Sequence, residues 1–305
     1  MDVVTGSFGY IGKYITKELI ASGRSVRTIT THPDKPNPFG EAVQAFPYHF
    51  DNPNLLRNTL KGCDTLFNTY WVRFDYQQWS FEKALENTNL LFTCAKEAGV
   101  KKIVQISVTN PSEDDDLPYY RGKALQEKAL RTSNIPYSII RPTLVYGKED
   151  ILVNNIAWTI RKFPYVPIFG SGDYKVQPVF VEDLAAIAVE YANKSGCGTV
   201  DAVGPEMFSY KEMLILMATI LNRKVKFIHI PPAFGIFLGK IIGAFVGDVV
   251  LTKDELRGLM VNKLCSSQEP NGHTLFSDWM KVNKDTIGER YTSELARHFY
   301  WRPSV

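Results

Sequence analysis

A tyrosine–lysine pair and two nearby hydroxyl residues offer the side chains needed for proton transfer. Tyr119 and Lys123 stand four residues apart in a segment with helical spacing, so both side chains share one helix face. An ammonium beside a phenol favours the phenolate and lowers the tyrosine pKa from about 10, which lets tyrosine exchange a proton in hydride chemistry. Ser107 and Thr109 end the preceding apolar run, where a hydroxyl can hold a substrate oxygen. The pair alone fits an ordinary helix face equally well.

A glycine-rich turn near the first residue could hold phosphates. Glycines at 6, 9 and 12 separate a short apolar run from a segment with helical spacing, which predicts strand, turn and helix. Glycine permits a tight turn and close approach of the backbone, and the amides at the helix N-terminus bind anions. Simple loop chemistry is the alternative. The predicted pyrophosphate site consists of Gly6, Ser7, Phe8, Gly9, Tyr10, Ile11 and Gly12.

The end of the second predicted strand indicates which dinucleotide would bind. A carboxylate about 20 residues after the glycine turn usually hydrogen-bonds the ribose hydroxyl of NAD. This chain has no carboxylate there and offers Thr30, Thr31, His32 and Lys35, which can bind a 2′-phosphate, so we expect NADP, with NAD as the alternative. Asp51, after the third predicted strand, is either an adenine neighbour or a turn residue.

Alternation of strands and helices predicts how these residues are positioned. We expect strands at 2–4, 25–30, 43–50, 65–70, 102–107 and 137–142, and helices at 13–20, 54–61, 81–98 and 118–132. This order predicts an α/β, Rossmann-like, doubly wound parallel sheet. We assign residues 1–147 to this dinucleotide-binding domain, with 179–203 returning to it. We expect a helix at 183–194 within this returning segment. We expect residues 148–178 and 204–305 to form a smaller C-terminal α+β region that binds substrate, with helices at 151–162 and 210–221 and a strand at 225–230.

Composition limits the class of protein. The chain has 305 residues, 45% of them hydrophobic, and a net charge of +3, which is too small for a nucleic-acid footprint. Its four cysteines are scattered, so we expect no metal site and no disulfide framework, and reduced thiols favour a cytoplasmic protein. No basic, apolar leader precedes the glycine turn, so we expect no signal peptide.

We make separate predictions for two segments near the end of the chain. Residues 231–247 are strongly apolar, but Lys240 and Asp248 leave them short of a membrane span. Packing inside the second domain is the first interpretation, and contact with a membrane surface or a protein partner is the alternative. Residues 279–301 are expected to form a helix that packs back on the body.

Four motifs in order resemble the short-chain dehydrogenase/reductase superfamily. They are the glycine turn at 5–12, the Tyr119/Lys123 pair, the run at 141–147 (RPTLVYG) and the run at 179–185 (VFVEDLA). The set is similar to the extended and atypical members, which are epimerase/dehydratase-like and NmrA-like proteins. Residues 251–259 (LTKDELRGL) also look similar to the subgroup related to the nucleotide-binding accessory subunit of respiratory complex I.

The resemblance implies roles for individual residues. Tyr119 would be the acid/base, Lys123 would bind the nicotinamide ribose, and Thr109, ahead of Ser107, would be the hydroxyl partner. The family often carries an asparagine in the helix before the fifth strand, where this chain has Ala84, with Asn87 one turn away. From the resemblance we expect an NAD(P)-dependent oxidoreductase or epimerase that transfers hydride to or from a carbonyl or alcohol carbon of a small molecule. The alternative is a non-catalytic cofactor-binding sensor or complex-stabilising subunit. Aromatic residues after Gly147 pack in the core in one interpretation, and in the other they line the cleft and favour an apolar substrate.

Overall fold

The computed structural model describes residues 1–298, without the side chains at 238, 244–246 and 298, and divides the chain into two compact units. Unit 1 comprises Met1–Pro142 and Val181–Ala202. Unit 2 comprises Thr143–Phe180 and the chain from Val203 onward. Each unit has its own hydrophobic core.

Unit 1 is built on one parallel sheet of seven strands, in the order β11-β6-β5-β4-β1-β2-β3. Strands β1, β4 and β5 are buried along their whole length, as expected where helices cover both faces. The order runs outward from β1 in two directions, so the sheet has its switch point between β1 and β4. The strands are β1 (Asp2–Thr5), β2 (Val26–Thr30), β3 (Val43–Pro47), β4 (Thr65–Asn68), β5 (Lys102–Ile106), β6 (Tyr137–Pro142) and β11 (Gly198–Ala202).

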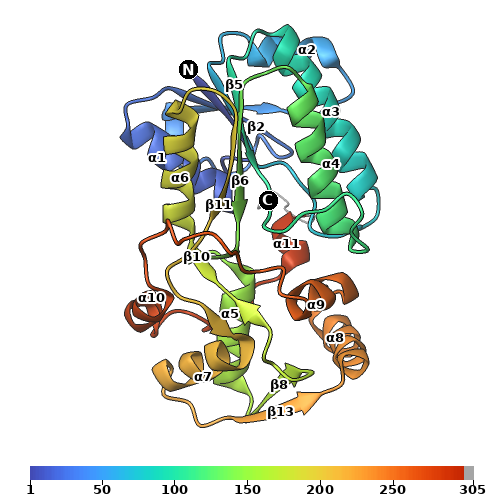
Figure 1. Cartoon of the computed structure of the whole chain (residues 1–305), viewed down its shortest axis with the longest axis vertical. Coiled ribbons are helices and arrows are strands. Elements are labelled where there is room, and N and C mark those ends of the chain that lie inside the picture. Colours follow the sequence, from blue (N-terminus) through green and yellow to red (C-terminus); the bar gives the residue numbers. More distant parts are fainter. Residues whose placement is uncertain (299–305) are drawn as a thin grey trace. The chain divides into compact units, whose positions relative to one another are not determined.

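Helices lie on both faces of this sheet (Figure 1). Helices α1 (Tyr10–Ala21) and α6 (Val181–Asn193) pack together on one face. Helices α2 (Pro53–Leu60), α3 (Phe81–Glu97) and α4 (Pro118–Thr132) cover the other, and a short 3-10 turn, η1 (Gly40–Ala42), precedes β3. The predicted doubly wound α/β fold is therefore confirmed.

Unit 2 consists of short strand pairs and helices around an aromatic core. The strands are β7 (Leu144–Tyr146), paired with β10 (Pro178–Phe180); β8 (Tyr165–Phe169), paired with β13 (Lys226–Ile230); and β9 (Lys175–Val176), paired with β12 (Phe208–Ser209). The helices are α5 (Ile151–Lys162), α7 (Tyr210–Ile220), α8 (Pro232–Val246), α9 (Lys253–Met260), α10 (Phe276–Asn283) and α11 (Glu294–His298). In the core, the fully buried Tyr146 ring meets Phe276 and Trp279 edge-on.

The expected single helix over residues 279–301 is wrong. The structure has α10 and α11, separated by a turn in which Gly288 adopts a φ of +72°. The Gly288 amide donates to Asn154 Oδ1 at 2.9 Å, and a Cβ here would lie 2.4 Å from the Trp158 backbone nitrogen. This close contact with α5 turns the chain between the helices. The predicted end at Trp301 lies outside the described residues.

Candidate functional site

The glycine turn connects β1 to α1 with almost no space between backbone atoms. Gly6 has a φ of +71°, and Gly9 is the N-cap residue of α1. A Cβ on Gly12 would lie 2.3 Å from the Gly6 carbonyl oxygen, so only glycine fits at this position. The first amides of a helix have no acceptor within it, and the first turn of α1 carries no acidic side chain. The turn is therefore suited to an anionic group such as a pyrophosphate.

Buried hydroxyls hold this turn to the neighbouring elements. The Ser7 amide donates to Thr28 Oγ1 on β2 at 3.0 Å, and Thr28 Oγ1 donates to the Val4 carbonyl. Thr16 Oγ1 lies 2.7 Å from Ser7 Oγ and 2.8 Å from the carbonyl oxygen of Gly12. These bonds fix the turn against both β2 and α1. Phe8, Tyr10 and Ile11 are partly buried beside it.

The loop after β4 lies against the same turn. Thr69 Oγ1 donates to the Thr5 carbonyl at 2.5 Å, and the Thr69 amide donates to Thr5 Oγ1 at 2.7 Å. A Cβ on Gly6 would lie 3.4 Å from Thr69 Oγ1. The glycine turn and the β4 loop therefore form one rigid edge at the switch point of the sheet.

The residues expected to choose the dinucleotide lie at the end of β2. Thr30 is buried and its Oγ1 accepts the His32 amide at 3.3 Å, whereas Thr31 is exposed. Burial and the neighbouring Lys35 charge lower the pKa of His32 below its usual range. Asp34, the next carboxylate, is exposed in the following turn, and Asp51 is exposed between β3 and α2. The first carboxylate after β2 is thus Asp34, and the residues at the end of the strand, from Thr30 to His32, include none.

Tyr119 and Lys123 lie in the first half of α4, and their environments differ. Tyr119 is partly exposed, with its ring edge-on to Phe81 and Tyr120. Lys123 is only 3% exposed, and its Nζ donates to the Ile106 carbonyl at 2.9 Å. Burial lowers the pKa of Lys123 to about 7. A lysine that is partly neutral at pH 7 stabilises a phenolate less than the sequence suggests.

Trp71 covers Lys123. The Lys123 ammonium lies 5.1 Å from the centre of the Trp71 ring, which stacks on Phe81 at 6.0 Å. A Cβ on Gly122 would lie 2.6 Å from this ring, so glycine lets the indole reach α4. The Trp71 Nε1 atom is buried and has no hydrogen-bond partner. Sequence analysis missed Trp71, because nothing in its local pattern places a loop residue over a helix.

Ser107 and Thr109, the two candidates for the hydroxyl partner, differ in their hydrogen bonds. Ser107 Oγ donates to Glu127 Oε1 at 2.6 Å, and the same carboxylate accepts two bonds from Arg141. Burial opposes ionisation of Glu127, but the bonds from Arg141 and Ser107 hold its pKa below the usual range. Thr109 is fully buried, and its amide donates to the Pro142 carbonyl. The Ser107 hydroxyl is thus part of a structural ion-pair network.

A chain of hydrogen bonds between buried polar side chains links strands β4 and β5 to helices α4 and α3. Asn68 Nδ2 donates to Gln105 Oε1 at 2.7 Å, and Gln105 Nε2 donates to Gln126 Oε1 at 2.9 Å. Gln126 Nε2 continues to Thr88 Oγ1 at 3.0 Å. The signal was present in the sequence, since Asn68 and Gln105 each interrupt an apolar strand, but their pairing requires the register of β4 and β5.

The position where the family often carries an asparagine lies on α3, at Ala84, and Asn87 follows one turn later. Ala84 is buried on α3, and the side chain of Asn87, one turn later, donates to the Tyr70 hydroxyl at 2.9 Å. Tyr70 packs with Tyr48 and Phe50 at the ends of β3 and β4. Asn87 therefore supports an aromatic cluster that the sequence did not reveal.

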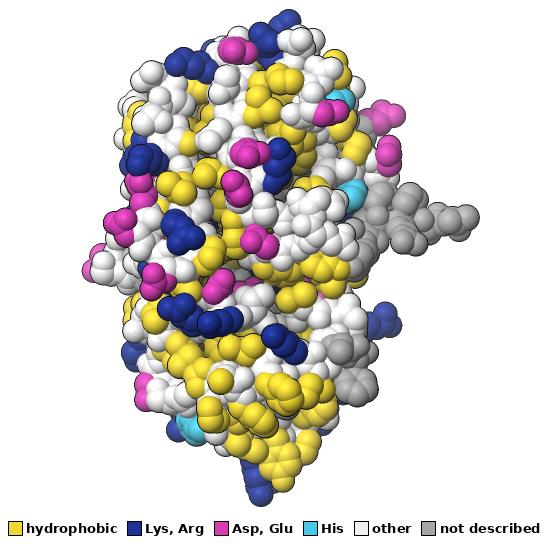
Figure 2. Space-filling model, turned by 90° about the vertical axis from the view of Figure 1, so that its right-hand side faces the viewer, with side chains coloured by type: hydrophobic (Ala, Val, Ile, Leu, Met, Phe, Trp, Pro, Cys, Tyr) yellow, Lys and Arg dark blue, Asp and Glu magenta, His cyan; other side chains and the backbone are white. Residues whose placement is uncertain are grey.

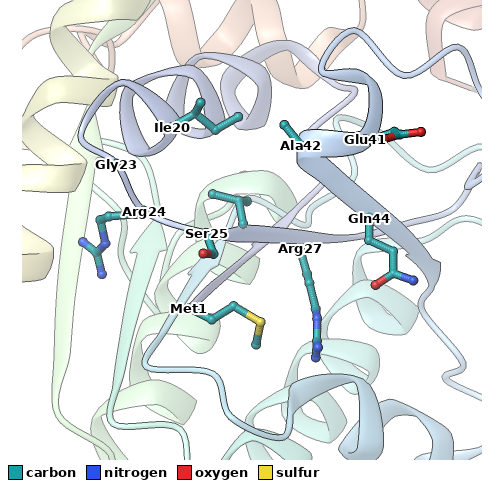
Figure 3. A pocket seen from close by; sticks show the side chains of 10 residues that line it. Met1, Ile20, Gly23, Arg24, Ser25, Arg27, Glu41, Ala42 and Gln44 are labelled. Carbon is teal, nitrogen blue, oxygen red and sulfur yellow. The ribbon is translucent and has the colours of Figure 1, made fainter.

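A hollow of about 450 Å³ lies elsewhere in unit 1 (Figure 3). It is lined by residues from the end of α1, the start of β2 and the start of β3, among them Ile20, Arg27 and Gln44. These are the amino ends of the strands, whereas parallel sheets bind ligands at their carboxyl ends. The hollow is therefore separate from the glycine turn. Within the described residues, no cluster of His, Cys, Asp and Glu is arranged to hold a metal.

Comparison with known proteins matches this chain to a family model and to a relative from a plant. A family model described as NAD(P)H-binding matches residues 6–155. A relative named NADH dehydrogenase [ubiquinone] 1 alpha subcomplex subunit 9, mitochondrial, from Arabidopsis thaliana, is 24% identical over 75% of this chain, and the match spans 60% of the length of that relative.

Two solved structures share the fold. A nucleoside-diphosphate-sugar epimerase from Staphylococcus aureus gives a TM-score of 0.73 at 17% identity, covering 92% of this chain and 99% of the other. An NADPH-dependent quinone oxidoreductase from Escherichia coli, solved with NADPH, gives 0.73 at 18% identity with the same coverage.

Proposed function

We propose that the chain belongs to the extended, NmrA-like branch of the short-chain dehydrogenase/reductase superfamily and binds an NAD(P) dinucleotide at the carboxyl edge of unit 1, in keeping with the NAD(P)H-binding family model that matches residues 6–155. The observation that carries this proposal is the tightness of the turn: a Cβ added at Gly12 would lie 2.3 Å from the Gly6 carbonyl oxygen, so only glycine lets α1 pack this closely on the turn after β1, as the third glycine of a dinucleotide-binding turn does. Gly6 to Gly12 would hold the pyrophosphate. NADP is favoured over NAD, because Thr31, His32 and Lys35 offer donors and the end of β2 offers no carboxylate.

The favoured activity is an oxidoreductase or epimerase reaction on a carbonyl or alcohol carbon. A bound nicotinamide would supply or accept the hydride. Tyr119 would exchange the proton, a role supported by its partial exposure at the start of α4. Lys123 would bind the ribose after its ammonium leaves the Ile106 carbonyl. Thr109 is the better hydroxyl partner, because the Ser107 hydroxyl already donates to Glu127.

A second function, binding without turnover, has specific support. Lys123 is buried under Trp71, its pKa is lowered to about 7, and Ala84 stands where the family often has asparagine. The Arabidopsis relative is named as a subunit of NADH dehydrogenase. In this alternative the dinucleotide would stabilise the chain within a larger assembly or report the redox state.

Tyr119→Phe separates the two functions, with Tyr120→Phe as the control. Binding of NADPH would be followed by its fluorescence, and turnover by NADPH oxidation with a soluble quinone and a series of apolar ketones and aldehydes. The enzyme hypothesis predicts that Tyr119→Phe lowers turnover by about 100-fold or more and leaves NADPH affinity unchanged. Equal turnover in wild type and Tyr119→Phe would refute the catalytic role. NADPH binding without turnover on any acceptor would support the second function.

A further inference from the structure

Helix α8 turns three glycines toward the rest of unit 2 and several of its described large apolar side chains toward solvent. Gly235, Gly239 and Gly243 follow one another at four-residue spacing, and all three are buried. A Cβ on Gly235 would lie 2.5 Å from the Phe169 ring, and one on Gly243 would lie 2.5 Å from the Asp248 carbonyl oxygen. The glycine face is therefore the face that packs against unit 2.

On the opposite face of α8, the described large apolar side chains are exposed. At 100° per residue, Phe234, Phe237 and Ile241 point away from the three glycines, and they are 48%, 57% and 40% exposed. Ile242 in the same helix and Ile228 in the preceding β13 are 45% and 44% exposed. A helix that packs in a globular core has the reverse arrangement. Contiguous exposed apolar side chains of this size mark a binding surface.

The charged residues around α8 indicate which kind of surface it would bind. Residues 222–247 contain four basic residues and no acidic residue. Lys240 lies within α8, and Arg223, Lys224 and Lys226 precede it, all of them exposed. Figure 2 shows, in its lower half, hydrophobic side chains gathered with lysine and arginine side chains at their margin. A basic margin around an apolar patch complements an anionic lipid surface.

The length of α8 decides how it would meet a bilayer. At 1.5 Å per residue, its 15 residues extend about 22 Å, which is less than the roughly 30 Å of a hydrocarbon core. In the part of the chain that the structure describes, no helix has the length and apolar character of a membrane span. We propose that α8 lies in the interface of an anionic membrane, inserting Phe234, Phe237 and Ile241 while the basic residues contact lipid phosphates.

Flotation of the full chain with lipid vesicles tests this proposal. We expect the protein to float with vesicles that contain phosphatidylglycerol, and to float less with phosphatidylcholine alone or at high salt. Phe234→Ser with Phe237→Ser should weaken binding by roughly tenfold or more, since two aromatic rings no longer insert. Lys240→Glu should weaken binding to anionic vesicles by about fivefold or more.

The control is Val282→Ser on α10, because Val282 is 82% exposed and lies outside the α8 surface. It should float like the wild type. All changed side chains are exposed, so circular dichroism should show an unchanged fold. Absence of flotation with anionic vesicles, or equal flotation of the double variant, overturns the proposal. A dimer in analytical ultracentrifugation that the double variant abolishes, without lipid binding, would overturn it in favour of self-association.

Discussion

Replacement of Lys123 by methionine should change how the free energy of unfolding depends on pH. Lys123 is 3% exposed, and burial lowers its pKa from 10.5 to about 7. In the unfolded chain the lysine keeps its proton up to about pH 10, so between about pH 7 and pH 10 unfolding takes up one proton. The cost of burying this group is fully present below pH 7 and decreases as the pH rises through this window, so the free energy of unfolding increases.

The size of the effect follows from the shift. At pH 7 about half of the folded molecules still hold the proton, so from pH 7 to pH 9 unfolding takes up somewhat less than one proton on average, which changes the free energy of unfolding by about 2 kcal/mol. Methionine has nearly the same length and does not titrate. The wild type should therefore gain about 2 kcal/mol relative to Lys123→Met between pH 7 and pH 9.

Urea denaturation at a series of pH values measures this difference directly. Lys96→Met is the control, since Lys96 is exposed in the last turn of α3. The difference between wild type and Lys123→Met should grow with pH, and the difference for Lys96→Met should not. A constant difference, or one that shrinks as the pH rises, would refute the assignment of Lys123 as a buried lysine with a lowered pKa.

Two further predictions concern the ion-pair network and the choice of dinucleotide. Glu127→Gln should lower the free energy of unfolding by about 3 kcal/mol, because the partly buried Arg141 loses its paired charge, whereas the exposed Glu113→Gln should change it by less than about 1 kcal/mol. Both are measured by denaturation, and equal effects would contradict a structural role for the network. Thr31→Asp should weaken NADPH binding by about tenfold or more and affect NADH less, because a carboxylate repels a 2′-phosphate. The fluorescence titration includes Thr93→Asp on the exposed side of α3, and an equal loss in both variants would contradict the location of the phosphate.

The sequence predicted the architecture of unit 1 because its signals are local. Glycine spacing, apolar runs and turn residues placed β1 to β6 and α1 to α4 close to their observed bounds. The third strand ends earlier than expected, at Pro47, since His49 adopts a φ of +50°. In unit 2, pairs such as β9 with β12 contain two residues per strand and form only through tertiary contacts.

The environment of the candidate site depended on contacts between distant residues. Tyr119, Lys123 and the glycines were found from spacing alone. The indole over Lys123 joins residues 52 positions apart, and the Glu127 network joins α4 and β6 with Ser107, the residue after β5. These contacts decide whether Lys123 is charged and which hydroxyl is engaged, and only the fold brings them together.

The central claim is that the turn from Gly6 to Gly12 holds the pyrophosphate of an NAD(P) dinucleotide. Titration of NADPH into wild type, Gly12→Ala and Gly198→Ala tests it most directly, because a Cβ on Gly12 meets the Gly6 carbonyl oxygen at 2.3 Å and one on Gly198 meets nothing within 4 Å. Saturable binding that Gly198→Ala preserves and Gly12→Ala weakens by about 100-fold is the predicted result. Absence of binding to the wild type, or equal binding by a folded Gly12→Ala variant, would contradict the claim.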